Sequence, residues 1–471
     1  VITHELAHIL HLDYVSNPVG KAARAVFGRV SLDWPFFPEQ GTPRWLIEGL
    51  ATWYETKLTD AGRLHGSYLE MQIRTAVLEG RFENIGQASG NSPLWPAGNR
   101  RYAYGTLFFD FLLHRHGEEK MGELVDAIGG QWVPYRIDAA GRHALGVSLT
   151  DEWNAWGDSL TVQYARLERR LEQLGPITEP ERITSGARWG LHPMSSPDGR
   201  WIAYTRSDGR SDSQLRVQDV ATGEVRSLGR TNGLATFSWM PDGRLLVSQL
   251  ELEGPYRSFG DLYFFDLGGG QRRLTRAARV EQPSASPDGE RAVAVRQGNG
   301  TNGLVLVDLS SGDVTPLVDP EPETHWAFPR WSPDGRWIAA SRWTPGAYYG
   351  VFILDATTGE IVSRVTDDRA LDHGPAWSPD SRSIVWASDR NGTFNIHGAA
   401  IDPASGAAGE PRLLTNVRTG VAHPSVDAAG QTLYFSGHHA DGWEIERIPY
   451  DPEGLRAAPR PLPRFEPTIE Q

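Results

Sequence analysis

The sequence predicts two domains of different class: a mainly α-helical domain over residues 1–174 and an all-β domain over residues 175–471. Three observations support this fold class. Apolar residues recur at spacings of three and four throughout the first range, as in amphipathic helices. Gly175-Pro176 then interrupts this pattern, and short alternating runs typical of strands follow. These runs repeat about every 45 residues, a period typical of β-propellers.

Composition narrows the classes of partner and cofactor. The 471-residue chain has a net charge of −13 and no run of several consecutive Lys or Arg residues, so nucleic acid is not an expected partner. It has no cysteine, which leaves histidine and carboxylate as metal ligands. No apolar run is long enough to cross a bilayer. Because the chain opens inside a helical motif with no signal peptide ahead of it, we expect it to be an internal fragment.

Five amphipathic stretches account for the expected helices of the first domain. They are THELAHILHL, PRWLIEGLATWYETKL, SYLEMQIRTAVLEG, YGTLFFDFLLHRHG and DEWNAWGDSLTVQYARLERRLEQL. Each places apolar residues along one face, and Gly and Pro cluster between them. The first domain is therefore expected to be built mainly from helices.

The first of these helices carries the motif H-E-x-x-H. His4 and His8 lie one helical turn apart, about 5 to 6 Å, so their ring nitrogens can bind one Zn²⁺. Glu5 points aside from that direction and can act as general base on a water at the metal. The alternative is two helix histidines beside a salt-bridging glutamate. His11 is expected in the core or just behind the ligands, because one straight helix cannot surround a tetrahedral ion.

A second helix is expected to supply the third ligand. In TPRWLIEGLATWYE, Glu48 has small residues such as Gly49 beside it, which allow two helices to approach closely. Glu55 is the alternative ligand. The alternative without a metal site is that Glu48 is an ordinary exposed glutamate on a helix. The W-L-I-E-G-L-A stretch resembles the gluzincin metallopeptidases, in which the glutamate of a W-x-x-E-G-x-A segment is the third zinc ligand. This resemblance implies that His4, His8 and Glu48 hold Zn²⁺.

A tyrosine segment extends the same resemblance. Gluzincin aminopeptidases carry a tyrosine in a Y-x-K-G segment, and its hydroxyl stabilises the oxyanion. Matching Y-A-Y-G at 102–105 on its glycine places Tyr102 in the catalytic position and Tyr104 where the lysine would be. Tyr104 is the alternative donor, and simple aromatic packing is the structural alternative. The resemblance covers residues 1 to about 170 but lacks the sheet that precedes the zinc helix in this family, so exopeptidase and endopeptidase are not distinguished.

The second domain repeats one unit six times. The copies are SSPDGRWIAYT, WMPDGRLLVSQ, ASPDGERAVAV, WSPDGRWIAAS, WSPDSRSIVWA and VDAAGQTLYFS. After each turn come an apolar strand, a strand ending near Asp and a short R-L-T-like strand, which together describe a four-stranded blade. A proline precedes the turn in five copies, with Phe237 as the exception. The turn aspartates are expected to be structural; they are Asp198, Asp242, Asp288, Asp334 and Asp380.

These repeats resemble the TolB-like, WD-related propeller family over about residues 181–465. The resemblance implies a six-bladed propeller. The segment ERIT at 181–184 is a further copy of the outer strand ahead of the first blade. We expect it to pair into the sixth blade and close the ring.

Together the patterns predict a gluzincin-type zinc metallopeptidase fused to a six-bladed TolB-like propeller. Glu5 is the expected general base and Tyr102 the expected oxyanion donor. The expected partners are a peptide or protein substrate and a protein that the propeller binds. The rival hypothesis is a non-catalytic propeller scaffold with a structural or vestigial zinc site, against which an intact Glu5 argues. A serine hydrolase lacks a G-x-S-x-G elbow. The TolB-like resemblance favours an extracytoplasmic bacterial protein, periplasmic or secreted.

Overall fold

The computed structural model describes residues 2–31, 33–60, 62–90, 92, 94–133, 135–345, 348–452 and 456–461. The chain divides into two compact units, with the division between Arg170 and Leu171. The two expected outer limits, Val1 and Gln471, lie outside the described residues. No helix in the described ranges is both long enough and apolar enough to cross a membrane.

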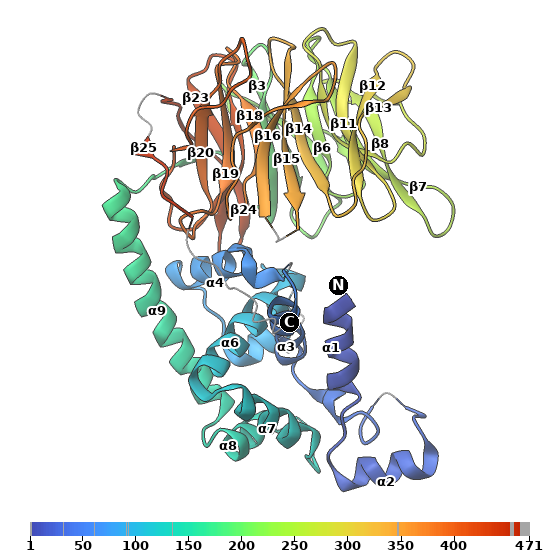
Figure 1. Ribbon diagram of the computed structural model, residues 1–471, viewed down its shortest axis with the longest axis vertical. Coiled ribbons are helices and arrows are strands. Elements are labelled where there is room, and N and C mark those ends of the chain that lie inside the picture. The colour runs from blue at the N-terminus through green and yellow to red at the C-terminus, as the bar shows by residue number, and fades with distance from the viewer. Residues whose placement is uncertain are drawn as a thin grey trace. The chain divides into compact units, whose positions relative to one another are not determined.

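Helices joined by loops and turns make up the described part of the first unit (Figure 1). Its helices are α1 (Ile2–Leu12), α2 (Pro18–Phe27), α3 (Arg44–Leu58), α4 (Tyr68–Leu78), α5 (Ile85–Ser89), α6 (Arg100–His116), α7 (Glu118–Gly129), α8 (Ile137–Ala144) and α9 (Leu149–Leu174), the last of which ends in the second unit. Single 3-10 turns lie at Pro38–Gly41, Arg63–His65 and Ala97–Asn99. The described residues of this unit contain no strand, so the sheet that precedes the zinc helix in gluzincins is not among them.

Helices α3 and α6 pack against each other through glycine at the centre of the first unit. A Cβ atom at Gly49 would meet the carbonyl of Gly105, and one at Gly105 would meet the carbonyl of Trp45. The small residue beside Glu48 therefore brings α3 against α6. Helix α1 also packs on α3, so α3 positions residues from both neighbours. This arrangement places the start of α6 beside the ligand residues of α1 and α3.

The second unit forms five hydrogen-bonded sheets (Figure 1). One has eight strands, because β2 pairs with β24 at Trp189 and Trp443 and so joins two four-stranded groups. We describe the unit as six four-stranded groups, which we call blades. The first three blades are β2 (Trp189–Ser195), β3 (Trp201–Ser207), β4 (Gln214–Asp219) and β5 (Val225–Arg230); β6 (Thr236–Trp239), β7 (Leu245–Leu252), β8 (Ser258–Phe265) and β9 (Gln271–Arg273); and β10 (Val280–Ala285), β11 (Arg291–Gln297), β12 (Asn302–Asp308) and β13 (Val314–Val318). The next two are β14 (His325–Trp331), β15 (Trp337–Thr344), β16 (Tyr348–Asp355) and β17 (Ile361–Arg364); and β18 (His373–Trp377), β19 (Ser383–Ser388), β20 (Asn395–Ala400) and β21 (Arg412–Leu413), with β25 (Arg456–Ala457) at the edge of the last. The sixth contains β22 (Val421–Val426), β23 (Thr432–His439), β24 (Gly442–Pro449) and β1 (Glu181–Arg182).

The inner strands of the blades follow one another around a propeller-like circle. Strand β2 contacts β6, and contacts continue through β10, β14, β18 and β22 back to β2. Strand β1 pairs antiparallel with β24, with Glu181 opposite Arg447. The segment expected to join the sixth blade therefore does so, and it ties the start of the second unit to its last blade.

The S-P-D-G turns are held by their own aspartates. Asp198 accepts a hydrogen bond from the Ser196 hydroxyl at 2.5 Å and one from the Arg200 backbone nitrogen at 3.0 Å. The same contacts recur at Asp288, Asp334 and Asp380. A carboxylate that satisfies its own turn backbone is a structural device, as the repeat pattern predicts.

The inner strands of five blades bulge one residue before the repeated proline. Positive φ angles mark these residues; they are His192 (58°), Gln282 (55°), Phe328 (50°), Gly374 (67°) and His423 (54°). Register shifts interrupt the strand pairing at each of these sites. Strand β6, where Phe237 replaces the proline, pairs with β7 without interruption. A bulge re-aims its side chain, and four of these five residues line the channel at the centre of the unit.

Candidate metal centre

Two histidines of α1 and one glutamate of α3 bring their ligand atoms together. His4 Nε2 lies 3.0 Å from His8 Nε2. Glu48 Oε2 lies 3.4 Å from the His4 nitrogen and 3.3 Å from the His8 nitrogen. Within the described residues, these three form the one group of His, Asp or Glu whose ligand atoms lie close enough to hold a metal ion. We call this group the metal cluster.

The spacing and chemistry of the metal cluster suit a tetrahedral cation. Ligand atoms about 2.0 to 2.1 Å from zinc and separated by a tetrahedral angle lie about 3.3 Å apart. Oε2 of Glu48 is buried and has no hydrogen-bond partner within the described part of the chain. A buried acceptor without a donor is costly, and a cation would satisfy it. Two imidazoles and one carboxylate also leave a fourth position open, as catalytic zinc sites do.

The far side of the His4 ring is held by an ion pair. Glu55 Oε2 and Arg63 Nη2 each lie 3.1 Å from His4 Nδ1. Arg63 binds the Glu55 carboxylate through Nε at 3.0 Å and Nη2 at 2.7 Å. Glu55, the alternative ligand, therefore faces Nδ1 and not the Nε2 atom of the metal cluster. A carboxylate in this position fixes the orientation and tautomer of a metal-binding histidine.

Burial and neighbouring charges set the ionisation of the metal cluster. Burial, the charge of Arg63 and the proximity of His8 lower the pKa of His4, so its ring is neutral at pH 7. Burial acts to raise the pKa of Glu48, but His8 and Arg101 outweigh it and the net pKa is lowered. The two groups are therefore in the neutral imidazole and carboxylate forms that bind a metal.

Tyr102 lies beside the metal cluster. Its ring centroid is 6.2 Å from that of His4. The guanidinium carbons of Arg63 and Arg101 lie 4.7 and 5.3 Å from the Tyr102 ring centroid. Burial and the negative charge of Glu48 raise the pKa of Tyr102. Its hydroxyl therefore keeps its proton at neutral pH and can donate a hydrogen bond.

Tyr104 belongs to the core of the first unit. Its side chain is 1% exposed, and its ring stacks on Trp153 with centroids 5.7 Å apart. The Tyr104 hydroxyl accepts a hydrogen bond from the Glu83 backbone nitrogen at 3.1 Å. Of the two tyrosines in Y-A-Y-G, Tyr102 is thus the one beside the metal cluster.

Glu5 and His11 occupy other positions on α1. Glu5 is exposed in the first turn of the helix, adjacent in sequence to His4. His11 Nε2 lies 3.1 Å from Glu39 Oε2 in a buried pair. Thr42 donates a hydrogen bond to the same carboxylate oxygen at 2.8 Å. His11 is therefore part of a separate polar contact in the interior and not of the metal cluster.

Two arginines complete the surroundings of the metal cluster, and no motif in the sequence indicates them. Arg63 lies in the 3-10 turn after α3. Arg101 Nε lies 3.6 Å from Glu48 Oε1. Arg101 directly precedes Tyr102, which is the single sequence signal that relates it to the site. Arg63 approaches His4 only through the folding of the loop after α3, so no local pattern reports it.

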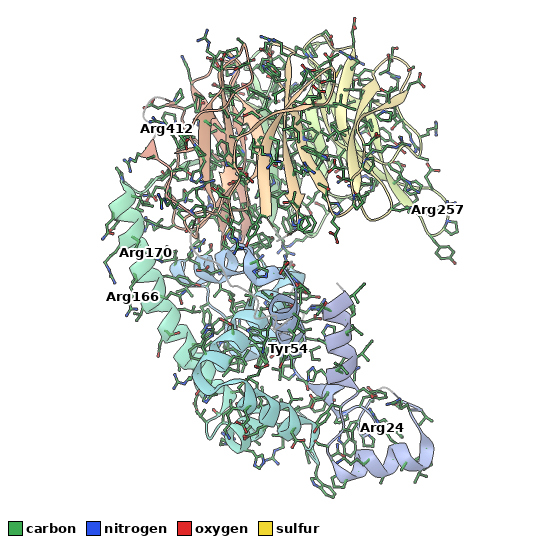
Figure 2. The ribbon with its side chains drawn as sticks, viewed as in Figure 1. Arg24, Tyr54, Arg166, Arg170, Arg257 and Arg412 are labelled. Carbon is green, nitrogen blue, oxygen red and sulfur yellow. The ribbon has the colours of Figure 1, made fainter. Side chains whose placement is uncertain are left out.

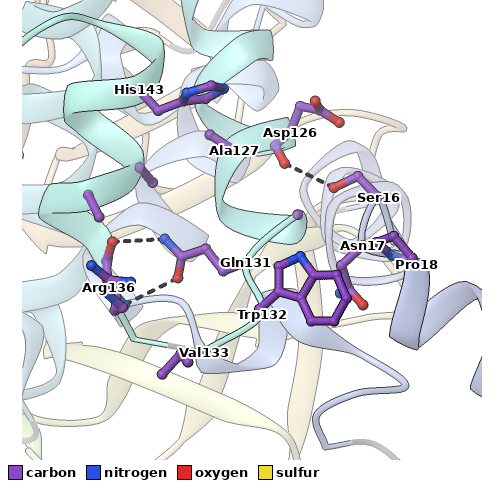
Figure 3. Close-up of a pocket in the computed structure, with 13 residues that line it drawn as sticks. Ser16, Asn17, Pro18, Asp126, Ala127, Gln131, Trp132, Val133, Arg136 and His143 are labelled. Carbon is purple, nitrogen blue, oxygen red and sulfur yellow. Dashed lines mark hydrogen bonds between the residues drawn. The ribbon is translucent and has the colours of Figure 1, made fainter.

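Two further hollows lie in the first unit, away from the ligand atoms. One, of about 420 Å³, is bordered by Trp132, His143 and Asp126, and the Gln131 side chain closes a loop by donating a hydrogen bond to the Arg136 carbonyl at 2.8 Å (Figure 3). The other, of about 700 Å³, is an apolar groove along another face of α1. Neither contains a residue of the metal cluster.

One family model matches a part of the second unit. A family model described as the TolB beta propeller domain, PD40, matches residues 280–456. The second unit therefore contains a TolB-like PD40 propeller domain. This match does not include the metal cluster, whose interpretation rests on its geometry.

Similar proteins cover only parts of the chain. It is 28% identical over 213 residues to "Uncharacterized peptidase YuxL" of Bacillus subtilis, which covers 42% of this chain and 29% of YuxL. It is 24% identical over 250 residues to an uncharacterized protein, Atu1656, of Agrobacterium fabrum, which covers 52% of this chain and 79% of that protein. A crystal structure of TolB from Acinetobacter baumannii aligns with a TM-score of 0.37 and 19% identity, over 59% of this chain and 64% of that one.

Proposed function

We propose that the protein is a zinc-dependent metallopeptidase of gluzincin type that hydrolyses peptide bonds. The convergence of His4 Nε2, His8 Nε2 and Glu48 Oε2 at 3.0 to 3.4 Å carries this proposal. An H-E-x-x-H helix joined by a glutamate from a second helix is the ligand set of that class. A relative named a peptidase, YuxL, supports hydrolytic activity.

In the proposed mechanism, each residue around the cluster has one task. His4, His8 and Glu48 hold the ion, and zinc bound there supplies Lewis acidity toward a carbonyl and a water. Glu5 takes the proton of the attacking water and delivers it to the leaving amine. Tyr102 donates a hydrogen bond to the oxyanion of the tetrahedral intermediate.

Glu55 and Arg63 support these steps without touching the substrate. Because Glu55 Oε2 lies 3.1 Å from His4 Nδ1, a proton on Nδ1 leaves the Nε2 lone pair directed at the cluster. Arg63 fixes the Glu55 carboxylate through two contacts. The pair thereby orients the His4 ring before any ion binds, which limits the ordering that binding requires.

The propeller and the location of the protein belong to the same proposal. We infer that the PD40 unit binds a peptide or protein partner or restricts its access to the peptidase unit. We also infer an extracytoplasmic location, periplasmic or secreted. Two comparisons support it: the match to the PD40 model, and a stretch of 61 residues that is 38% identical to a Tol-Pal system protein TolB from Francisella tularensis.

The second candidate function is a non-catalytic scaffold with a structural or vestigial zinc site. One observation favours it: the family model that matches the chain, at residues 280–456, describes a propeller and not a peptidase. The exposed Glu5 favours the peptidase, because a structural zinc site has no use for a general base.

The test compares the parent protein with Glu5→Gln at equal zinc content. We expect about one zinc per chain in both, measured by elemental analysis. We expect Glu5→Gln to hydrolyse a mixture of fluorescence-quenched peptides about 10² to 10⁴ times more slowly, because glutamine cannot accept the proton. Glu119→Gln, an exposed glutamate in the first turn of α7, is the matched control and should retain full activity.

Two outcomes would contradict the proposal. Equal hydrolysis by Glu5→Gln and the parent would remove Glu5 from the mechanism. A parent protein that binds zinc but cleaves no peptide would instead support the scaffold.

A further inference from the structure

The inner strands of the second unit surround a channel with a cavity of about 220 Å³. Three aromatic rings from two bulged histidines and one phenylalanine meet there. The ring centroids of His192 and His423 lie 4.1 Å apart, and that of Phe328 lies 5.7 and 6.0 Å from them. At about 30 Å³ per water molecule, the cavity has room for about seven waters or one ligand of amino-acid size.

Arg330 of β14 is the one side chain with a formal charge at neutral pH among the described residues that line this cavity. Its guanidinium donates a hydrogen bond to the Pro329 carbonyl at 3.2 Å. No carboxylate of the described residues forms an ion pair with it. The other five repeats carry uncharged residues in register with it, and these are Met194, Ser238, Ser284, Ala376 and Ser425. Arg330 is therefore a departure from the repeat that turn and strand formation do not require.

The described residues that line the channel carry a net positive charge. Burial lowers the pKa of Arg330 to about 10, which still leaves it charged at pH 7. Burial, followed by the charge of Arg330, lowers the pKa of His192 to about 3. Burial also lowers the pKa of His423. Both rings are therefore neutral. A half-buried cation without a counter-charge is unfavourable, and it attracts an anion into the cavity.

Two serine hydroxyls add hydrogen-bond donors. Ser238 Oγ accepts a hydrogen bond from the Ala285 backbone nitrogen at 2.9 Å, and Ser284 Oγ accepts one from the Trp331 backbone nitrogen at 3.0 Å. Both side chains are 5% exposed and line the cavity. Neither hydroxyl proton has an acceptor within the described part of the protein, so each remains available to a ligand oxygen.

We propose that this channel binds the carboxylate group of a small organic acid, with Arg330 as its counter-charge and Ser238 and Ser284 as further donors. A guanidinium matches the two oxygens of a carboxylate in one plane. A divalent cation is disfavoured by the charge of Arg330, and the channel histidines do not form a described group of convergent metal ligands. The site lies in the second unit and does not depend on the proposed peptidase activity.

Calorimetry on the full chain tests this proposal, with glutarate as the ligand and its neutral diamide, glutaramide, as the chemical control. The metal is first removed with phenanthroline, which carries no carboxylate, so that glutarate cannot bind at the metal cluster. We expect glutarate to bind and glutaramide to bind at least about tenfold more weakly. Inorganic phosphate is titrated in parallel, and tighter binding of phosphate than of glutarate would overturn the choice of a carboxylate.

Variants locate the binding. Arg330→Gln should weaken glutarate binding at least about tenfold, whereas Arg330→Lys keeps the charge and should retain part of the affinity. Arg257→Gln is the matched control, because Arg257 is exposed near the β7–β8 hairpin (Figure 2). Unchanged affinity in Arg330→Gln, or no binding of glutarate by the parent at millimolar concentration, would overturn the proposal. If Arg330→Gln fails to fold by circular dichroism, Ser284→Ala carries the test: weaker glutarate binding supports the site and unchanged binding overturns it.

Discussion

Glu55 and His4 form a contact in which the carboxylate oxygen Oε2 lies 3.1 Å from Nδ1 of the ring. The other ring nitrogen, Nε2, faces Glu48 Oε2 at 3.4 Å. Two glutamates of α3, about two helical turns apart, therefore hold opposite sides of one imidazole. The two distances therefore distinguish the roles of the glutamates: Glu48 lies where a metal ligand would, and Glu55 lies where it can orient the His4 ring.

We expect Glu55→Gln to weaken zinc binding about 10- to 100-fold while the metal cluster remains able to bind one ion. The amide keeps the shape of the side chain but removes the negative charge that holds the Nδ1 proton. Competition with a chromogenic chelator measures the affinity. Glu118→Gln is the control. Glu118 is an exposed residue of α7 that forms an ion pair with Lys57 of α3. Complete loss of zinc in Glu55→Gln would mean that Glu55 is itself a ligand.

Tyr102→Phe should lower the activity, whereas Tyr104→Phe should lower the stability. Loss of the Tyr102 hydroxyl removes the proposed oxyanion donor, and we expect kcat to fall about 10²- to 10³-fold with unchanged zinc content. Tyr104→Phe removes the acceptor of the Glu83 backbone nitrogen, so it should lower the free energy of unfolding by about 1 kcal/mol with kcat retained. Peptide hydrolysis and thermal unfolding on the same samples check both. The reverse pattern would make Tyr104 the donor.

Gly105→Ala should destabilise the first unit by about 1 to 3 kcal/mol. Its Cβ would meet the carbonyl of Trp45, so α3 and α6 would have to separate. Gly122→Ala on α7 is the matched control, because a Cβ there meets open space and alanine favours a helix by about 0.5 to 1 kcal/mol. Urea unfolding followed by circular dichroism measures both. Equal stability of the two variants would contradict the close packing of α3 on α6.

One buried and two half-buried histidines should make the second unit sensitive to acid. Burial lowers the pKa of His192 and His397 to about 3 and that of His373 to about 4, from about 6.5 in the unfolded chain. Between these values the unfolded chain binds more protons, so the free energy of unfolding falls as the pH is lowered, by about 1.4 kcal/mol per pH unit for each group. Asp372 acts in the opposite sense, because burial raises its pKa to about 6.

Urea titrations from pH 7 to pH 4.5 measure this dependence. We expect the midpoint to fall continuously below about pH 6.5. His397→Gln should reduce the slope, since it removes one of the buried titrating groups. A midpoint that stays constant down to pH 5 would show that these histidines are protonated in the folded protein.

The sequence indicates features that depend on local pattern. The H-E-x-x-H spacing places His4 and His8 on one face of α1 because helical geometry is regular. The S-P-D-G turns define the blades because each aspartate satisfies its own turn. The uninterrupted pairing of β6 coincides with the replacement of proline by Phe237, but the sequence pattern did not predict the bulges of the other five blades.

Features that depend on the meeting of distant segments could not be predicted in the same way. Glu48 and Glu55 lie on one helix, and only the packing of α1 decides which ring nitrogen each one faces. Arg63 reaches His4 from a loop with no motif. Arg330 is an intermediate case: it is visible as a charged residue within an uncharged register of the repeat, but its position in the channel requires the closed arrangement of six blades.

The pairing of β1 with β24 has a consequence for how the protein is made. Nearly the whole second unit separates these two strands in sequence, so β1 emerges from the ribosome long before its partner exists. The ring can close only when the last blade has been synthesised, and such distant pairing slows folding. Once the ring is closed, however, the first and last blades are held to each other by the pairing of β1 with β24, so neither can unfold without breaking that pairing. We therefore expect the mature unit to resist proteases through a high kinetic barrier to opening.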